Sequence, residues 1–139
     1  MSARTKARKR AIDILYIADI RQISMAQSLA QEAERAASEP ARLASWLYAR
    51  DIVDGIVDHA DEIDELIATY SQGWTLSRMP TIDRAILRIG IWEILFNSDV
   101  PNSVAIDEAV EAAKVLSTDD SAGFINGLLG RIAQTAPSS

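Results

Sequence analysis

The sequence of 139 residues contains no cysteine and a single histidine, and these shortages exclude several kinds of functional site. Without cysteine the protein has no disulfide, no thiolate metal site and no cysteine nucleophile, which fits a reducing compartment. No apolar run approaches the roughly 18 residues that a membrane-spanning helix needs. The basic start is not followed by an unbroken apolar stretch, so we expect no secretory signal, no membrane association and a cytoplasmic location.

Motifs of common enzymes are also missing from the sequence. There is no P-loop, no glycine fingerprint for a dinucleotide and no nucleophile elbow. The histidine, His59, stands in the acidic stretch DIVDGIVDHADEIDE (51–65), which suggests a carboxylate–histidine metal site as one interpretation. Helical di-metal sites need Glu-x-x-His pairs from two helices, and this sequence has none. Its acids instead follow the spacing of a solvated helix face, so we expect no enzyme, no metal and no other cofactor.

Helical periodicity runs through almost the whole chain, with no strand-like alternation and no internal repeat. It predicts helices over residues 3–22, 25–37, 41–72, 82–97, 103–117 and 120–134. A straight helix over 41–72 would be about 48 Å long, so we expect a break near His59–Asp61, with Asp61 as the cap of a further helix. The prediction is an all-α, compact single domain of about seven helices in two packed helical halves. It spans residues 1–136, and 137–139 form a disordered tail.

The connection 73–81 precedes the most apolar predicted helix and is a candidate boundary between the two halves. Thr81 is the predicted N-cap of that helix, and Asp83 lies in its first turn, where the helix dipole favours an acid. Gly90 lies inside the same helix and costs roughly 1 kcal/mol relative to alanine. We therefore expect the backbone of another helix to pass close to Gly90.

The charge of the protein is unevenly distributed along the chain. The protein is acidic, with a formal net charge of −6, yet its first ten residues carry five cations and no acid: Arg4, Lys6, Arg8, Lys9 and Arg10. On a helix these side chains point around the whole circumference, whereas a membrane-surface helix needs one cationic face opposite one apolar face. A cationic tip of this kind suits phosphates that approach from several directions, which indicates nucleic-acid binding.

Three stretches of the sequence resemble the NusB family of bacterial transcription antitermination factors. They are ARKRAIDILY (7–16), TIDRAILRIGIWEIL (81–95) and VPNSVAIDEAVEAAKVLSTDDSAGFINGLLGRI (100–132), and the resemblance covers nearly the whole chain. It implies an RNA-binding factor that, with the ribosomal protein NusE, binds the single-stranded boxA element of nascent RNA. The complex on RNA polymerase would then promote processive transcription of ribosomal RNA operons. The alternative is a helical protein-interaction module that functions mainly as a homodimer.

The resemblance also implies roles for particular residues. It assigns the RNA contacts to Arg4, Lys6, Arg8, Lys9, Arg10, Asp120 and Phe124, and the NusE contacts to Tyr16 and Asp83. Tyr16 lies off the main apolar stripe of its helix, which favours an exposed hydroxyl.

Two of these residues have a second interpretation from spacing alone. Phe124 either stacks on an RNA base or belongs to the core, since it lies four residues before Leu128. Asp120 either faces the RNA and the partner or caps the last helix. Ala122 and Gly123 precede Phe124 where some relatives carry a basic residue, so more of the RNA affinity should depend on the N-terminus.

Overall fold

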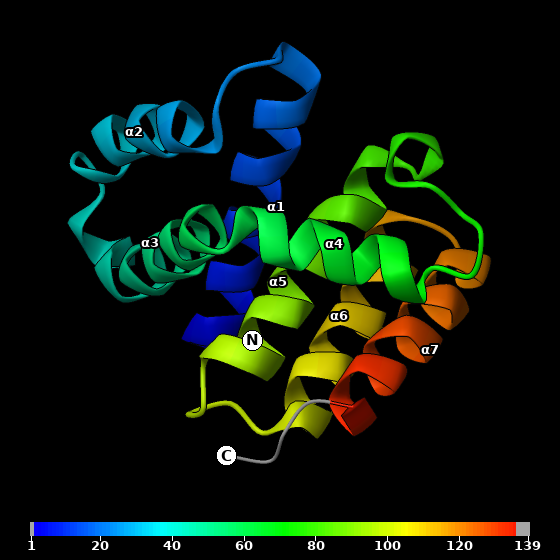
Figure 1. Ribbon diagram of the computed structural model, residues 1–139. Helices are drawn as coiled ribbons and strands as arrows, with labels where there is room; N and C mark the ends of the chain where they lie inside the picture. Colours follow the sequence, from blue (N-terminus) through cyan, green and yellow to red (C-terminus); the bar gives the residue numbers. More distant parts are fainter. Residues whose placement is uncertain (1, 136–139) are drawn as a thin grey trace.

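The computed structural model describes residues 2–135, which fold into seven α-helices and two short 3-10 helices (Figure 1). Met1 and residues 136–139, including the predicted tail 137–139, lie outside the described residues. The result confirms the all-α prediction of about seven helices. In chain order the elements are α1 (Ala3–Arg21), α2 (Met25–Ala36), η1 (Pro40–Arg42), α3 (Leu43–Asp58), α4 (Ala60–Tyr70), η2 (Leu76–Arg78), α5 (Thr81–Phe96), α6 (Asn102–Leu116) and α7 (Asp119–Thr135).

The predicted break in the long helical pattern is confirmed, but both predicted caps are wrong. Helix α3 ends at Asp58 and α4 begins at Ala60, and Figure 1 shows the two helices following one another. Asp61 lies inside the first turn of α4 rather than at its cap. Thr81 is the first helical residue of α5, because Pro80, with its fixed φ, takes the cap position in extended geometry.

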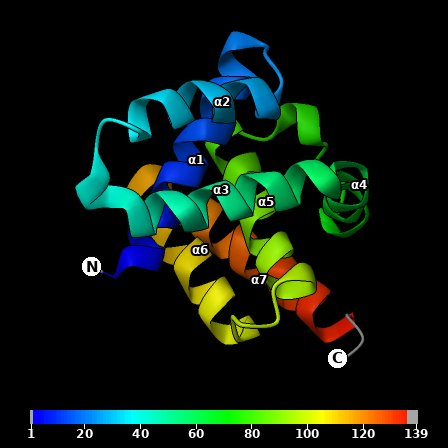
Figure 2. The same cartoon turned by 90° about the vertical axis from the view of Figure 1, so that its left-hand side faces the viewer.

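The helices form two groups that meet across α5. Helices α1, α2 and α3 pack on one another, α4 contacts both α5 and α7, and α6 lies between α5 and α7. Figure 2 shows the first group from its outer side, with α2 above α1 and α3. Helix α4 belongs with α6 and α7 in the second group, so the chain passes from the first group to the second at His59, between α3 and α4. The connection 73–81 therefore does not divide the molecule as predicted.

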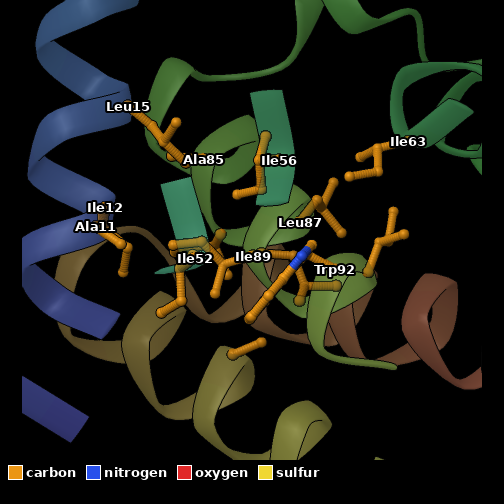
Figure 3. Packing of buried hydrophobic residues seen from close by; sticks show 14 of the residues in the cluster. Ala11, Ile12, Leu15, Ile52, Ile56, Ile63, Ala85, Leu87, Ile89 and Trp92 are labelled. Atoms are coloured by element: carbon orange, nitrogen blue, oxygen red, sulfur yellow. The ribbon is translucent and has the colours of Figure 1, made fainter. Parts of the chain in front are cut away.

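Helix α5 is the centre of the hydrophobic core. Isoleucines and leucines from α1, α3 and α5 point toward one another around Trp92 (Figure 3). A Cβ at Gly55 would lie 1.9 Å from Trp92 Nε1, so the indole packs directly on the backbone of α3. A Cβ at Gly90 would lie 2.7 Å from Leu129 Cδ1, so a side chain of α7, not a helix backbone as predicted, approaches Gly90. Among residues 2–135, no helix has the length and apolarity to cross a membrane.

Candidate nucleic-acid interface

The first two turns of α1, residues 3–10, form a basic tip. Ser2 caps the helix by accepting a hydrogen bond from the Thr5 backbone N–H at 3.1 Å, and no acid lies in the first turn. Arg4, Lys6 and Lys9 are exposed, and Lys6 and Lys9 form no ion pair within residues 2–135. Their charges add to the positive end of the helix dipole. Three of the five predicted phosphate contacts are thus at the surface.

Arg8, predicted to hold phosphate, is instead buried at 7% exposure. Its Nε donates to Glu93 Oε1 at 2.9 Å and Oε2 at 3.1 Å, while Nη2 lies 2.9 Å from Oε2. A fourth contact joins Nη1 to Glu108 Oε1 at 3.3 Å. Burial alone would lower the pKa of Arg8, but the hydrogen bonds and charge of Glu93 outweigh it and raise the pKa. The prediction for Arg8 is corrected: its guanidinium faces the interior.

Arg10 is half-buried and faces α2 and α3. Its Nη2 lies 3.4 Å from Glu32 Oε1, its Nη1 donates to Ser45 Oγ at 3.3 Å, and its guanidinium lies 5.9 Å from the Trp46 ring centroid. Arg10, Glu32 and Ser45 line a groove of about 480 Å³ between α1, α2 and α3, in which both cations and acids are present. The charge of Arg10 is therefore largely compensated within the fold.

A second hollow, the α1–α6 groove, lies on another side of the tip and has a volume of about 260 Å³. It is lined by Thr5, Arg8, Lys9, Ile12, Glu108, Glu111, Ala112, Val115 and Leu116. Val115 is 78% exposed, so apolar surface is open to solvent here. On α1, Tyr16 and Ile20 continue the face of Ile12 at four-residue steps. Tyr16 is 39% exposed, as its place off the apolar stripe predicts.

Helix α7 begins three residues after Leu116, so the chain carries the end of the α1–α6 groove to the start of α7. Thr118 caps α7, because its Oγ1 accepts a hydrogen bond from the Ser121 backbone N–H at 3.0 Å. Asp120 is exposed in the first turn. The capping interpretation of Asp120 is therefore wrong, and its side chain is free to face a ligand.

Phe124 is half-buried and packs against the hydrophobic core with part of its ring. It meets Trp74 edge to face, with ring centroids 4.9 Å apart and an interplanar angle of 82°. Trp74 is also half-buried, so the two rings share a surface position. Part of the Phe124 ring thus belongs to the core, while the rest is exposed, so stacking on an RNA base stays a prediction.

Trp74 is a candidate site residue that the sequence analysis did not single out. It lies in the connection between α4 and α5, far from Phe124 along the chain. Two arginines fix this connection: Arg84 Nη1 donates to the Leu76 carbonyl and Arg131 Nη2 to the Tyr70 carbonyl, each at 2.9 Å. A tryptophan in a connection between helices could have marked this residue as a candidate site residue. Nothing in the sequence spacing, however, indicates that it lies beside Phe124.

Asp83, predicted to contact NusE, is completely buried in the first turn of α5. Neither of its carboxylate oxygens has a hydrogen-bond partner among residues 2–135. An acid at this position ordinarily accepts a hydrogen bond from the cap residue, but the cap is Pro80, which has no N–H. Since Asp83 has no exposed surface, this location corrects the prediction of a direct partner contact.

The acidic stretch around His59 lies on the outside of α3 and α4. Its acids at helical spacing, Asp54, Asp58, Asp61 and Glu65, are all exposed. The described part of the chain holds no group of three or more potential ligands placed to bind a metal ion. The solvated-face interpretation of this segment is confirmed.

Comparisons with known proteins point to one family. The model of the NusB family matches residues 5–134. The transcription antitermination protein NusB of Leifsonia xyli subsp. xyli is 74% identical over 137 residues, which are 99% of this chain and 95% of the relative. The protein of the same name from Clavibacter sepedonicus is 68% identical, with 96% and 97% covered.

Solved structures agree with the sequence comparisons. The structure of T. maritima NusB matches with a TM-score of 0.82 and 32% identity, covering 97% of this chain and 93% of that chain. A chain in the crystal structure of antitermination factors NusB and NusE in complex with double-stranded RNA matches with a TM-score of 0.80 and 25% identity. That match covers 96% of this chain and 98% of the other.

Proposed function

The chain belongs to the NusB family, and from this premise we propose that it is an RNA-binding transcription antitermination factor. With the ribosomal protein NusE it binds the single-stranded boxA element of nascent RNA. The resulting complex on RNA polymerase promotes processive transcription of ribosomal RNA operons. The role is non-enzymatic, and it uses surfaces rather than a catalytic centre.

The exposed part of the basic tip carries this proposal. Arg4, Lys6 and Lys9 face solvent on an otherwise acidic protein, so phosphates meet positive charge mainly there. Each phosphate that a cation neutralises releases condensed counterions, which favours binding and makes it salt-dependent. Screening over about 10 Å keeps the acidic body from cancelling this local attraction.

In this proposal the RNA bases are contacted by residues near the start of α7 rather than by the basic tip. Phe124 and Trp74 present two half-buried rings held edge to face, and single-stranded RNA is commonly bound by stacking its bases on such side chains. Asp120 lies one turn before Phe124 and supplies an acceptor for base amino groups. Lys9 and Leu116, which lies three residues before α7, both line the α1–α6 groove, so one RNA strand is proposed to reach from the basic tip to the start of α7, and the groove itself is left to the protein partner.

The α1–α6 groove and Tyr16 provide the surface for the protein partner. Val115 and Leu116 leave apolar area exposed in the groove, and Ile20 does so one turn after Tyr16 on α1; exposed apolar area of this kind is typical of protein interfaces. The similar chain that was solved with NusE and double-stranded RNA supports both kinds of partner. A second copy of this chain would cover the same apolar area, so homodimerisation is the competing proposal.

Gel shifts with a boxA-like single-stranded RNA, with and without NusE, test the RNA proposal across salt concentrations. We expect the Lys6→Ala/Lys9→Ala double variant to bind more weakly, with a log–log salt slope shallower by about 1.4, or about 0.7 per lost phosphate contact. The matched control is Arg35→Ala/Arg50→Ala, which removes two exposed cations from α2 and α3. Equal slopes for both double variants would contradict the proposed RNA surface.

Mass measurements in solution separate NusE binding from homodimerisation. We expect Tyr16→Ala to weaken the NusE complex at least tenfold while its melting temperature stays nearly unchanged, because the side chain is exposed. A protein that is dimeric at micromolar concentration, with Tyr16→Ala making it monomeric and NusE having no effect, would favour the homodimer instead.

A further inference from the structure

We propose that Arg8 and Glu93 act as positioning residues: their buried ion pair holds the basic tip in place for RNA without contacting the RNA. This inference rests on the proposed function. It gives Arg8 a role opposite to that of its neighbours in the sequence, since Arg4, Lys6 and Lys9 act through their exposure.

The pair is built to hold the start of α1 against three other helices. Glu93 comes from α5, and both of its oxygens are held by the Arg8 fork. The Tyr48 hydroxyl of α3 donates to Glu93 Oε2 and accepts from Asn97 Nδ2 at 3.1 Å. Glu108 of α6 takes the remaining guanidinium nitrogen at 3.3 Å. A planar fork with several fixed partners gives one orientation, which a flexible ammonium would not.

Residues of the basic tip also contact members of this network. Arg4, one turn before Arg8, lies with its guanidinium 4.7 Å from the Tyr48 ring centroid. The Thr5 hydroxyl donates to Glu108 Oε1 at 2.8 Å. The tip is the first part of α1, and the end of a helix frays unless tertiary contacts hold it, because its first N–H groups have no partner within the helix. The network therefore decides whether the exposed cations are already ordered when RNA arrives.

Direct contact between Arg8 and a phosphate is disfavoured by the same geometry. The side chains of Arg8 and Glu93 are 8% and 1% exposed. If Arg8 left to meet a phosphate, the Glu93 carboxylate would stay buried without its cation, which is strongly unfavourable. The positioning role and a contact role then predict opposite signs for a change at Glu93.

Replacing the acid gives the decisive measurement. We expect Glu93→Gln to weaken binding of a boxA-like single-stranded RNA about tenfold, the factor that ordering one residue of a frayed tip costs. If Arg8 contacted phosphate, removing a nearby negative charge would instead free the guanidinium and strengthen binding. Arg8→Gln should weaken binding to a similar extent, and the Arg8→Gln/Glu93→Gln double variant should bind no worse than either single variant.

Hydrogen exchange provides the readout that a general loss of stability would not give. Measured where all variants are folded, Glu93→Gln should speed amide exchange over residues 3–10. The matched control is Asp64→Asn, which breaks a second arginine–carboxylate pair, with Arg88 Nε at 2.9 Å, away from the tip. Asp64→Asn should leave both the RNA affinity and the exchange at the tip unchanged. Arg8→Lys, which keeps the positive charge, should bind RNA more tightly than Arg8→Gln but less tightly than the unmodified protein.

Normal or tighter RNA binding by Glu93→Gln would overturn the inference while leaving the proposed function intact. A salt slope that is shallower by about 0.7 in Arg8→Gln, but not in Glu93→Gln, would show a direct phosphate contact and would also overturn it. If the unmodified protein bound no RNA, the proposed function itself would fail, and the inference with it.

Discussion

The interface between α1 and α5 has an ion pair at each end, and the two ends differ in instructive ways. At one end an arginine of α1, Arg8, meets an acid of α5, Glu93. At the other end the roles are exchanged: Arg84 and Arg88 of α5 approach Asp19 of α1 at 3.5 and 3.4 Å. The start of α1 thus meets the end of α5 and the end of α1 meets the first half of α5, so the two helices run antiparallel.

Burial separates the two ends. Arg8 and Glu93 are 8% and 1% exposed, whereas Asp19 and Asp64 keep 26% and 35% of their side-chain surface. Both Arg8 and Arg88 have raised pKa values, because carboxylate hydrogen bonds outweigh the lowering effect of burial. An arginine with an exposed partner can lose that partner to water, but one with a buried partner cannot. The Arg8 end is therefore the less tolerant one, and it adjoins the exposed cations.

The largest effect is expected at the buried end. Arg8→Met should lower the free energy of unfolding by about 3–5 kcal/mol, because Glu93 would remain buried without its cation. Urea denaturation followed by circular dichroism gives this value. Arg8→Met/Glu93→Leu should recover much of the loss, and a loss under about 1 kcal/mol in the single variant would remove the distinction between the ends.

The same substitution at the other end should be milder. Arg88→Met should lower the free energy of unfolding by about 1–3 kcal/mol, since water can solvate the partly exposed Asp64 and Asp19. The two denaturation curves are to be compared under one set of conditions. A larger loss for Arg88→Met than for Arg8→Met would reverse the comparison.

The exposed cations beside Arg8 should contribute little to the fold. Lys6→Ala/Lys9→Ala should change the free energy of unfolding by no more than about 0.5 kcal/mol per site, as is usual for surface positions. Its RNA affinity should nevertheless fall. Thermal melts of this variant and of Arg8→Met, measured side by side, show whether Lys6 and Lys9 serve RNA binding while Arg8 serves the stability of the fold.

The smallest effect is expected at Asp13, which lies on α1 between the two ends. Although Asp13 is exposed, partial desolvation of its carboxyl in the groove between α1, α2 and α3 raises its pKa above the usual 3.8, while Lys9 opposes the shift and Glu32 adds to it. The folded protein thus holds this proton more tightly, and the contribution to stability is present below that usual pKa and lost as pH rises through the folded-state pKa. Asp13→Asn should slightly raise the melting temperature at pH 7. No difference should remain at pH 3, and a lower melting temperature at pH 7 would contradict the pKa shift.

Local sequence patterns by themselves determined the secondary structure of this protein and the location of its cation cluster. Apolar spacing gave the seven helices and the break at His59, because a helix face repeats every few residues along the chain. The concentration of cations at the start and the resemblance to the NusB family were equally readable without coordinates. The exposure of Tyr16 also followed from its angle on α1.

Only the tertiary structure decided which of the predicted site residues are available. Helical spacing gives the direction of a side chain about its own axis, but not what another helix places opposite it. The partner of Arg8 is 85 residues away, Trp74 reaches Phe124 from a connection, and Asp83 is covered completely. Charge and aromatic character belong to the residue, whereas burial belongs to the packing of distant segments. Five cations that are alike in sequence therefore include one that holds the fold and three that face solvent.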